Sequence, residues 1–251
     1  MTGGALRVVA AIVALLGLWE LVCALLEIPE MTLPAPSDAW QALVDARAVL
    51  LPALRTTATE ALAGLAVAAV LGGVLGTTLA LSRRIRSFLE PVLAVSQTVP
   101  VIALAPLLVT WLGFGFAPKL LVVALIGFFP IVVAVTAGVQ RADAALDELV
   151  RGAGAGRWRR FRLAELPAAA PAVVAGARVS ALLVVPGAVA AELVGATDGL
   201  GRLLLIYDRD GRTTLTFACV LLLALLGLAC WALVETLDAL LRRCGLTGRR
   251  Q

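Results

Sequence analysis

The sequence contains no histidine and a single lysine, Lys119. Without histidine the chain cannot build a histidine proton relay, a histidine metal site or a Ser-His-Asp triad. A P-loop needs a Gly-Lys pair, and the lysine follows Pro118, so the chain cannot carry a Walker A motif of its own. No carboxylate pair lies in a plausible pocket. The sequence therefore predicts a chain that is not an enzyme and has no catalytic, cofactor or metal site.

Cysteine is also scarce. The four cysteines form no CxxC motif, and three of them lie in apolar runs; they are Cys23, Cys219, Cys230 and Cys244. Neither a disulfide framework nor a zinc site is indicated.

Apolar residues are abundant. They make up 61% of the 251 residues, and the mean hydropathy is +0.99, whereas a soluble domain has about 45–50% apolar residues. The formal charge is +4, but the basic residues cluster in short loops between apolar runs, as the positive-inside rule predicts. The composition indicates a polytopic membrane protein and gives no support to nucleic acid as a partner.

Six apolar stretches are long enough to span a membrane, which takes about 20 residues. They lie near 6–26, 57–81, 88–112, 119–139, 171–195 and 214–241. The first contains Trp19 and Glu20 and lacks a cleavage site, which favours a retained helix over a signal peptide. The sequence thus predicts an all-α membrane protein with about six transmembrane helices.

The distribution of arginine predicts that both termini are cytoplasmic, because the arginine-rich loops then lie inside. On this basis 1–56 hold the first span and an extracytoplasmic amphipathic segment, 57–241 form the core, and 242–251 are a basic cytoplasmic tail. The amphipathic segment is expected to begin a short helix at Ser37 or Asp38.

Small residues recur every four positions in the second span, at Gly64, Ala68, Gly72 and Gly76. Such a face lets another helix approach closely, so it predicts helix packing.

The longest polar break, at about 141–168, is predicted to form a cytoplasmic helix–turn–helix. Gly154 and Gly156 permit a sharp turn, Trp158 and Phe161 give the second helix an apolar side, and Pro167 ends it. We call residues 141–168 the knob. The alternative is an ordinary basic loop held at the lipid headgroups.

The spacing in the knob resembles the "EAA" loop of bacterial ABC importer permeases. That pattern is Glu-Ala-Ala, three residues, Gly, nine residues, Ile, any residue and Leu-Pro. Glu148, Gly154, Leu166 and Pro167 fall in register. The departures are Leu149 and Val150 for the two alanines and Ala164 for the isoleucine.

The resemblance covers the chain from about Leu33 to the sixth span, and the LPAPSDAW stretch is similar to the nitrate/sulfonate/taurine group. It implies a type I (MetI-like) permease fold in the bacterial cell membrane. It also implies a homodimer with two ATPase subunits that bind ATP and Mg, and an extracytoplasmic solute-binding protein. Residues Trp158 to Phe161 would be buried in the ATPase. The implied ATPase-coupling residues are Glu148, Gly154, Arg157, Trp158, Arg159, Phe161, Leu166 and Pro167.

The third span is interrupted by Pro91, Pro100 and Pro106. Broken backbone survives in a membrane where it is buried in protein or lines a cavity. The span is therefore read either as part of the translocation path or as a kinked packing helix. The candidate path residues are Ser96, Gln97, Thr98, Pro100, Arg178 and Glu192.

Three charged residues within the spans have competing interpretations. Arg178 either snorkels to the headgroups or faces the interior and pairs with a carboxylate or an anion. Glu192 is either a solvated helix-end carboxylate or a gate residue, and Glu60 is expected to reach the membrane interface. The polar stretch 202–213 is expected outside, where it could meet a binding protein.

The expected function is a permease for a small organic or anionic solute, driven by a separate ATPase. By the resemblance, the solute is of the thiamine pyrimidine precursor, aliphatic sulfonate, taurine or nitrate type, with a slight lean to the pyrimidine precursors. An ion-coupled secondary transporter and a non-transporting membrane scaffold are the rival classes.

Overall fold

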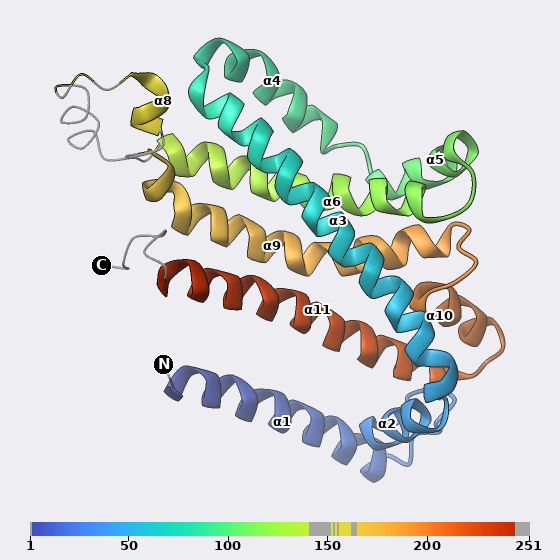
Figure 1. Cartoon of the computed structure of the whole chain (residues 1–251). Coiled ribbons are helices and arrows are strands. Elements are labelled where there is room, and N and C mark those ends of the chain that lie inside the picture. Colours follow the sequence, from blue (N-terminus) through green and yellow to red (C-terminus); the bar gives the residue numbers. More distant parts are fainter. Residues whose placement is uncertain (1, 141–151, 153, 155, 162–164, 244–251) are drawn as a thin grey trace.

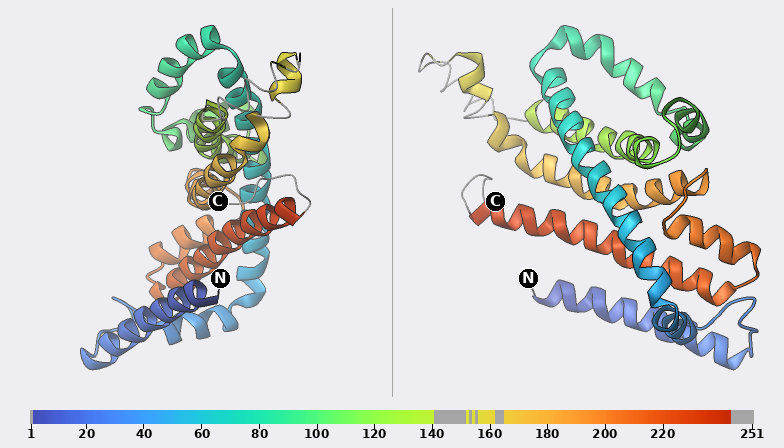
Figure 2. Two further views of the ribbon diagram at one scale, coloured as in Figure 1. Left: turned by 90° about the vertical axis from the view of Figure 1, so that its left-hand side faces the viewer. Right: turned by 45° about the vertical axis from the view of Figure 1, so that its right-hand side comes forward.

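The computed structural model of the chain describes residues 2–140, 152, 154, 156–161 and 165–243. All regular elements in this part of the chain are helices. Four of them are long and apolar enough to cross a membrane: α3 (Arg47–Leu81), α6 (Phe116–Gln140), α9 (Leu166–Leu193) and α11 (Thr213–Arg243). The bundle is built around α3, which crosses α6 and α9 obliquely and packs against both (Figures 1 and 2).

The third predicted span is not one continuous helix. The chain forms α4 (Arg83–Ser96), a 3-10 turn at Val101–Leu104 and α5 (Ala105–Leu112), with a bend of 81° between the two parts. Pro100 lies at the break and has no backbone N–H to continue α4. If the bent pair counts as one span, the described residues hold up to five candidate spans, and α1 (Thr2–Leu25) adds a shorter apolar helix at Val13–Leu25.

The start of α1, the end of α11 and the short helix α8 (Arg157–Arg160) lie at one end of the bundle, and α10 (Leu200–Arg209) lies at the other (Figure 1). The first residues of α1 and the last residues of α11 are therefore on the same side of the bundle as α8. The stretch expected to be a polar external segment, 202–213, is largely helical, because α10 packs Tyr207 against α11.

The amphipathic segment forms α2 (Pro36–Asp45), but the predicted N-cap is wrong. Ala35 is the capping residue, and the carboxylate of Asp38 accepts its backbone N–H at 3.0 Å. The hydroxyl of Ser37 instead donates to Glu20 of α1 at 2.6 Å. The helix packs beside α11 and is followed directly by α3, which begins ten residues before the predicted start at 57.

The predicted small-residue face of α3 is confirmed as a packing surface. A Cβ added at Gly64 would lie 2.2 Å from Val123 Cγ1 of α6, and one added at Gly72 would lie 2.8 Å from the carbonyl oxygen of Phe128. These glycines let α3 and α6 approach closely enough to bury Val123 completely.

Gly64→Ala is therefore expected to destabilise the protein by about 1–3 kcal/mol, because overpacking must push the two helices apart. Gly73→Ala is the matched control: it lies on the same helix with nothing within 4 Å of the added Cβ. The thermal midpoint in detergent should fall for the first variant and stay level or rise for the second. Equal midpoints for both variants would mean that the α3–α6 contact is not tight.

Candidate functional site

The second half of the knob is a turn followed by α8. Gly154 has φ +75° with nothing within 4 Å of an added Cβ, so the turn uses a conformation that glycine adopts without strain. The rings of Trp158 and Phe161 stack with centroids 5.5 Å apart. Trp158 is 67% exposed, whereas Phe161 is 5% exposed. The knob thus presents one aromatic ring outward and anchors itself with the other.

The burial of the stretch from Trp158 to Phe161 in a partner stays a prediction, but Phe161 is already covered within this chain. Its ring belongs to a cluster of this chain's own core, which joins α3, α6 and α9 through Ala68, Ile131 and Ala169. The apolar ring is more favourably placed there than in water, so Trp158 is left as the aromatic that a partner can cover.

The other predicted knob residues are only partly described. Glu148 lies outside the described residues. Leu166 and Pro167 start α9. Proline has no backbone N–H, and this is tolerated here because N–H groups in the first turn of a helix have no intrahelical acceptor. Arg159 is exposed, and Arg157 begins α8. The knob therefore leads directly into a helix that runs the length of the bundle (Figure 1).

The polar residues at the break between α4 and α5 are all exposed. Ser96 Oγ donates to the carbonyl oxygen of Leu93 at 2.8 Å, and Thr98 Oγ1 donates to that of Val95 at 2.7 Å. Among the described residues, no hydrogen bond or ion pair joins Ser96, Gln97, Thr98 or Pro100 to Arg178 or Glu192. Their role in a translocation path stays a prediction.

Arg178 faces the interior and pairs with carboxylates of α11. Its guanidinium lies 2.6 Å from Glu235 Oε2 and 3.2 Å from Asp238 Oδ2. Asp238, 4% exposed, also accepts a hydrogen bond from Arg242 Nε at 3.0 Å. The pairing alternative is the one observed, and it ties α9 to α11 near the knob end of the bundle.

Arg178→Ala is expected to lower the free energy of unfolding by about 1–3 kcal/mol, because it removes a hydrogen bond to Asp238 and an ion pair with Glu235 while Arg242 still pairs with Asp238. Arg243→Ala, at an exposed position on the same side, is the control and should leave the thermal midpoint unchanged. Unchanged stability and unchanged solute uptake in Arg178→Ala would leave Arg178 as a snorkelling residue only.

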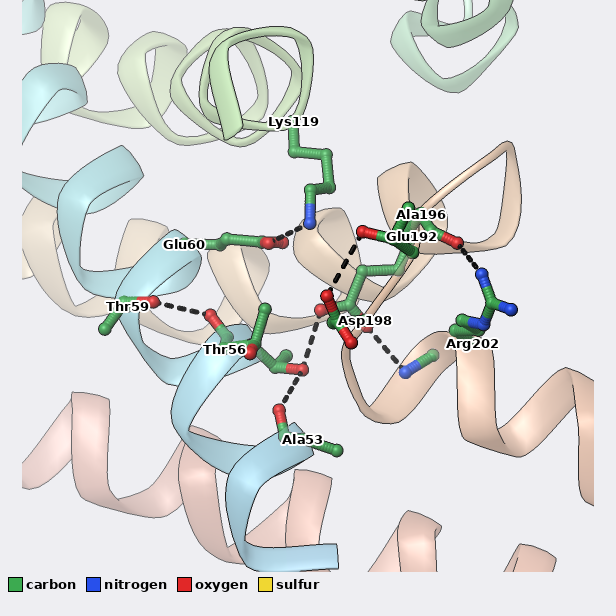
Figure 3. Close-up of polar contacts among 12 residues, drawn as sticks. Ala53, Thr56, Thr59, Glu60, Lys119, Glu192, Ala196, Asp198 and Arg202 are labelled. Atoms are coloured by element: carbon green, nitrogen blue, oxygen red, sulfur yellow. Dashed lines mark hydrogen bonds and ion pairs between the residues drawn. The ribbon is translucent and has the colours of Figure 1, made fainter. Parts of the chain in front are cut away.

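A second charged group is buried at the opposite end of the bundle. Glu60 of α3, 1% exposed, forms an ion pair with Lys119 of α6, and Glu192 of α9, 2% exposed, lies beside them (Figure 3). The expectation that Glu60 reaches the interface is wrong, and so is the solvated alternative for Glu192. Close helix packing buries both carboxylates, and the lysine compensates part of their charge.

The carboxylate of Glu192 sits in a cradle made by three segments. Its Oε1 accepts from Thr57 Oγ1 at 2.7 Å, and its Oε2 accepts from the backbone N–H of Gly201 at 2.6 Å. The hydroxyl of Thr57 in turn accepts from the N–H of Leu200 at 2.9 Å. The cradle thus joins the end of α9 to the start of α10 and to α3.

Two glycines make room for this carboxylate. A Cβ at Gly199 would lie 2.1 Å from Glu192 Oε1, and one at Gly201 would lie 2.8 Å from Oε2. Lys119, Thr57 and this turn were not singled out as a site from the sequence. The available signal was a lone lysine at the start of an apolar span, together with glycine-rich residues just after Glu192.

Residues 68–243 match the family described as "Binding-protein-dependent transport system inner membrane component". The chain is 33% identical to a probable ABC transporter permease protein of Haemophilus influenzae, covering 91% of this chain and 92% of that one. It is 36% identical to the riboflavin transport system permease protein RibX of Chloroflexus aurantiacus, with 95% and 90% covered. It is 32% identical to the formylaminopyrimidine transport permease protein ThiX of Halalkalibacterium halodurans, with 90% and 91% covered.

The fold is similar to that of a solved structure, a chain of the MetNI methionine ABC transporter in an inward-facing conformation. The TM-score is 0.66 at 19% sequence identity, and the similarity covers 80% of this chain and 97% of that chain. This likeness establishes the MetI-like architecture.

Proposed function

This chain belongs to the binding-protein-dependent transport system inner membrane components, and from that premise we propose that its knob couples solute import to a separate ATPase. It is an ABC importer permease of the MetI type and a multi-pass protein of the bacterial inner membrane. Family membership implies ABC ATPase partners and a binding protein. The proposal adds the stoichiometry, two copies of the permease with two ATPase subunits, and the residues that make the contact.

The main support for the coupling role is that the two stacked rings of the knob differ in exposure. Phe161 is fixed in the core formed by α3, α6 and α9, while Trp158 is exposed next to Arg159. A partner bound to the exposed side of the knob would move α8, and the packing of Phe161 would transmit that movement to α3, α6 and α9. Rigid-body motion of this kind is how transporters alternate access to a central site.

For the solute, we propose a heterocyclic vitamin or vitamin precursor of the riboflavin or formylaminopyrimidine kind. The permeases with those names match at least 90% of this chain. Those named for taurine and aliphatic sulfonates match 69–86% of it at 28–32% identity. Sulfonate, taurine and nitrate stay as alternatives.

Uptake of radiolabelled riboflavin, formylaminopyrimidine, taurine and an alkanesulfonate should be compared in cells with and without this chain. In cells that lack this chain, we expect uptake of one of the two heterocycles to be lost and uptake of taurine and the alkanesulfonate to be unchanged. Loss of taurine or alkanesulfonate uptake would contradict the solute assignment. The subunit numbers are tested separately by native mass spectrometry of the complex purified through a tag on this 26.0 kDa chain.

A further inference from the structure

Helix α9 connects the knob to the Glu192 cradle. It begins at Leu166, within the last residues of the knob, and Glu192 lies in its last turn, at the opposite end of the bundle (Figure 1). We propose that Glu192 is a positioning residue that latches the end of the permease opposite the knob, and that ATP-driven movement of the knob releases it. This inference rests on the proposed coupling function, and it assigns a role to the end of α9 that lies farthest from the knob.

The cradle is shaped for a carboxylate. Each oxygen of Glu192 accepts one hydrogen bond, from Thr57 and from the Gly201 N–H, and both donors belong to other helices. An amide whose NH₂ group faced the Gly201 N–H would lose that bond, and one whose NH₂ group faced Thr57 would require the hydroxyl to accept instead of donate. The latch thus depends on the two acceptor oxygens of Glu192 and not only on the size of its side chain.

The contact is polar, and this suits a junction that opens. The free energy of apolar helix packing is roughly proportional to the buried area, so such a contact weakens gradually as helices separate. The two hydrogen bonds to one carboxylate instead form or break together. The junction closes a loop of only six residues, 194–199, between α9 and α10. Because α10 is packed on α11, a rotation of α9 must either break the latch or move α10 away from its own partner.

A pocket of about 170 Å³ with a mixed apolar and polar lining borders the loop of the latch at Gly199. Its lining includes Thr56, Asp198, Gly199 and Arg202. Arg202 donates to the carbonyl oxygen of Ala196 at 2.6 Å, which stiffens the loop while the latch is closed.

The direct test is hydrogen exchange at the Leu200 and Gly201 amides, the two backbone donors of the latch. The protein to use is the complex purified from native membranes through a tag on this chain, without nucleotide and after trapping with ATP and vanadate. We expect exchange at these amides to be about tenfold faster in the trapped state, while amides in the middle of α10 are unchanged. Equal exchange in both states would overturn the latch and leave the cradle as a static tie.

Variants at Thr57 separate the latch from the fold. Thr57→Val is isosteric and removes the hydroxyl, so exchange at Leu200 and Gly201 should be fast in both states, and ATP hydrolysis without binding protein should rise about threefold or more. Thr57→Ser keeps the hydroxyl and should behave as wild type. Wild-type behaviour of Thr57→Val would count against the latch. If Thr57→Val does not fold, the comparison of nucleotide states in the wild type decides alone.

Failure of the latch can be told apart from failure of the proposed function. If no ATPase is present in the purified complex, the coupling function is wrong and the latch is wrong with it. If the ATPase is present and hydrolyses ATP while the two amides do not change, only the latch is wrong.

Discussion

Gly154→Val is expected to insert into the membrane normally and to lose its ATPase, with uptake falling tenfold or more. A β-branched residue is disfavoured at the φ of +75° that Gly154 adopts, at about 1–2 kcal/mol or more, so the turn before α8 must rearrange. No atom of the described residues lies within 4 Å of a Cβ added at Gly154, and the strain is therefore local to the knob. The measurement is the amount of ATPase that co-purifies through a tag on the variant, together with solute uptake.

Gly211→Val is the matched control. Gly211 also has positive φ, at +66°, and nothing within 4 Å of an added Cβ, but it lies in the turn between α10 and α11 at the other end of the bundle. Its strain should be similar while the ATPase stays bound. A Gly154→Val protein that keeps its ATPase and transports normally would show that the knob is not the coupling element.

Lys119→Met is expected to be the most destabilising substitution of a charged residue in the described part of the chain. It removes the cation from a buried group in which Glu60 and Glu192 would remain. Leaving a buried charge without its partner is typically destabilising by about 3–5 kcal/mol. The yield of folded protein and the thermal midpoint in detergent should both fall sharply.

The double variant Lys119→Met/Glu60→Gln should recover part of this loss, because it removes the carboxylate that the lysine neutralises. The recovery measures the coupling between the two side chains. A Lys119→Met protein as stable as the wild type would show that the ion pair does not hold α3 to α6.

The spans and the packing face could be predicted from the sequence because both depend on local patterns. Apolar runs mark helices that must satisfy their own backbone in lipid, and glycines at every fourth position mark close approach. Pro100 also indicated a break in the third span, but the 81° bend depends on how α4 and α5 pack on the rest of the chain. The division of the chain at 56 and 241 stays a prediction.

The buried charge group could not be predicted, because its members are far apart in the sequence. Glu60 and Lys119 are separated by 59 residues, and Thr57 and Glu192 by 135. Taken singly, Glu60 and Glu192 near span ends look like interfacial residues. Only the packing of three helices shows that their carboxylates share one buried site.

The knob could be located from the spacing of its residues in the sequence, but its exposed side could not be distinguished from the side that packs on the core. Trp158 and Phe161 lie three residues apart and look equivalent in the pattern. The structure turns Phe161 into this chain's core and leaves Trp158 exposed, because only Phe161 reaches the surface formed by α3, α6 and α9. The coupling contact itself, and the translocation path, stay predictions.

The energy source of transport decides whether this chain works with a separate ATPase. The complex should be purified through a tag on this chain, placed in liposomes with its binding protein, and supplied with the radiolabelled solute identified by the uptake comparison. The account predicts that ATP drives accumulation when a protonophore has abolished the proton gradient, and that an imposed gradient without ATP drives none. Accumulation driven by the gradient alone, with no ATPase subunit in the preparation, would contradict it.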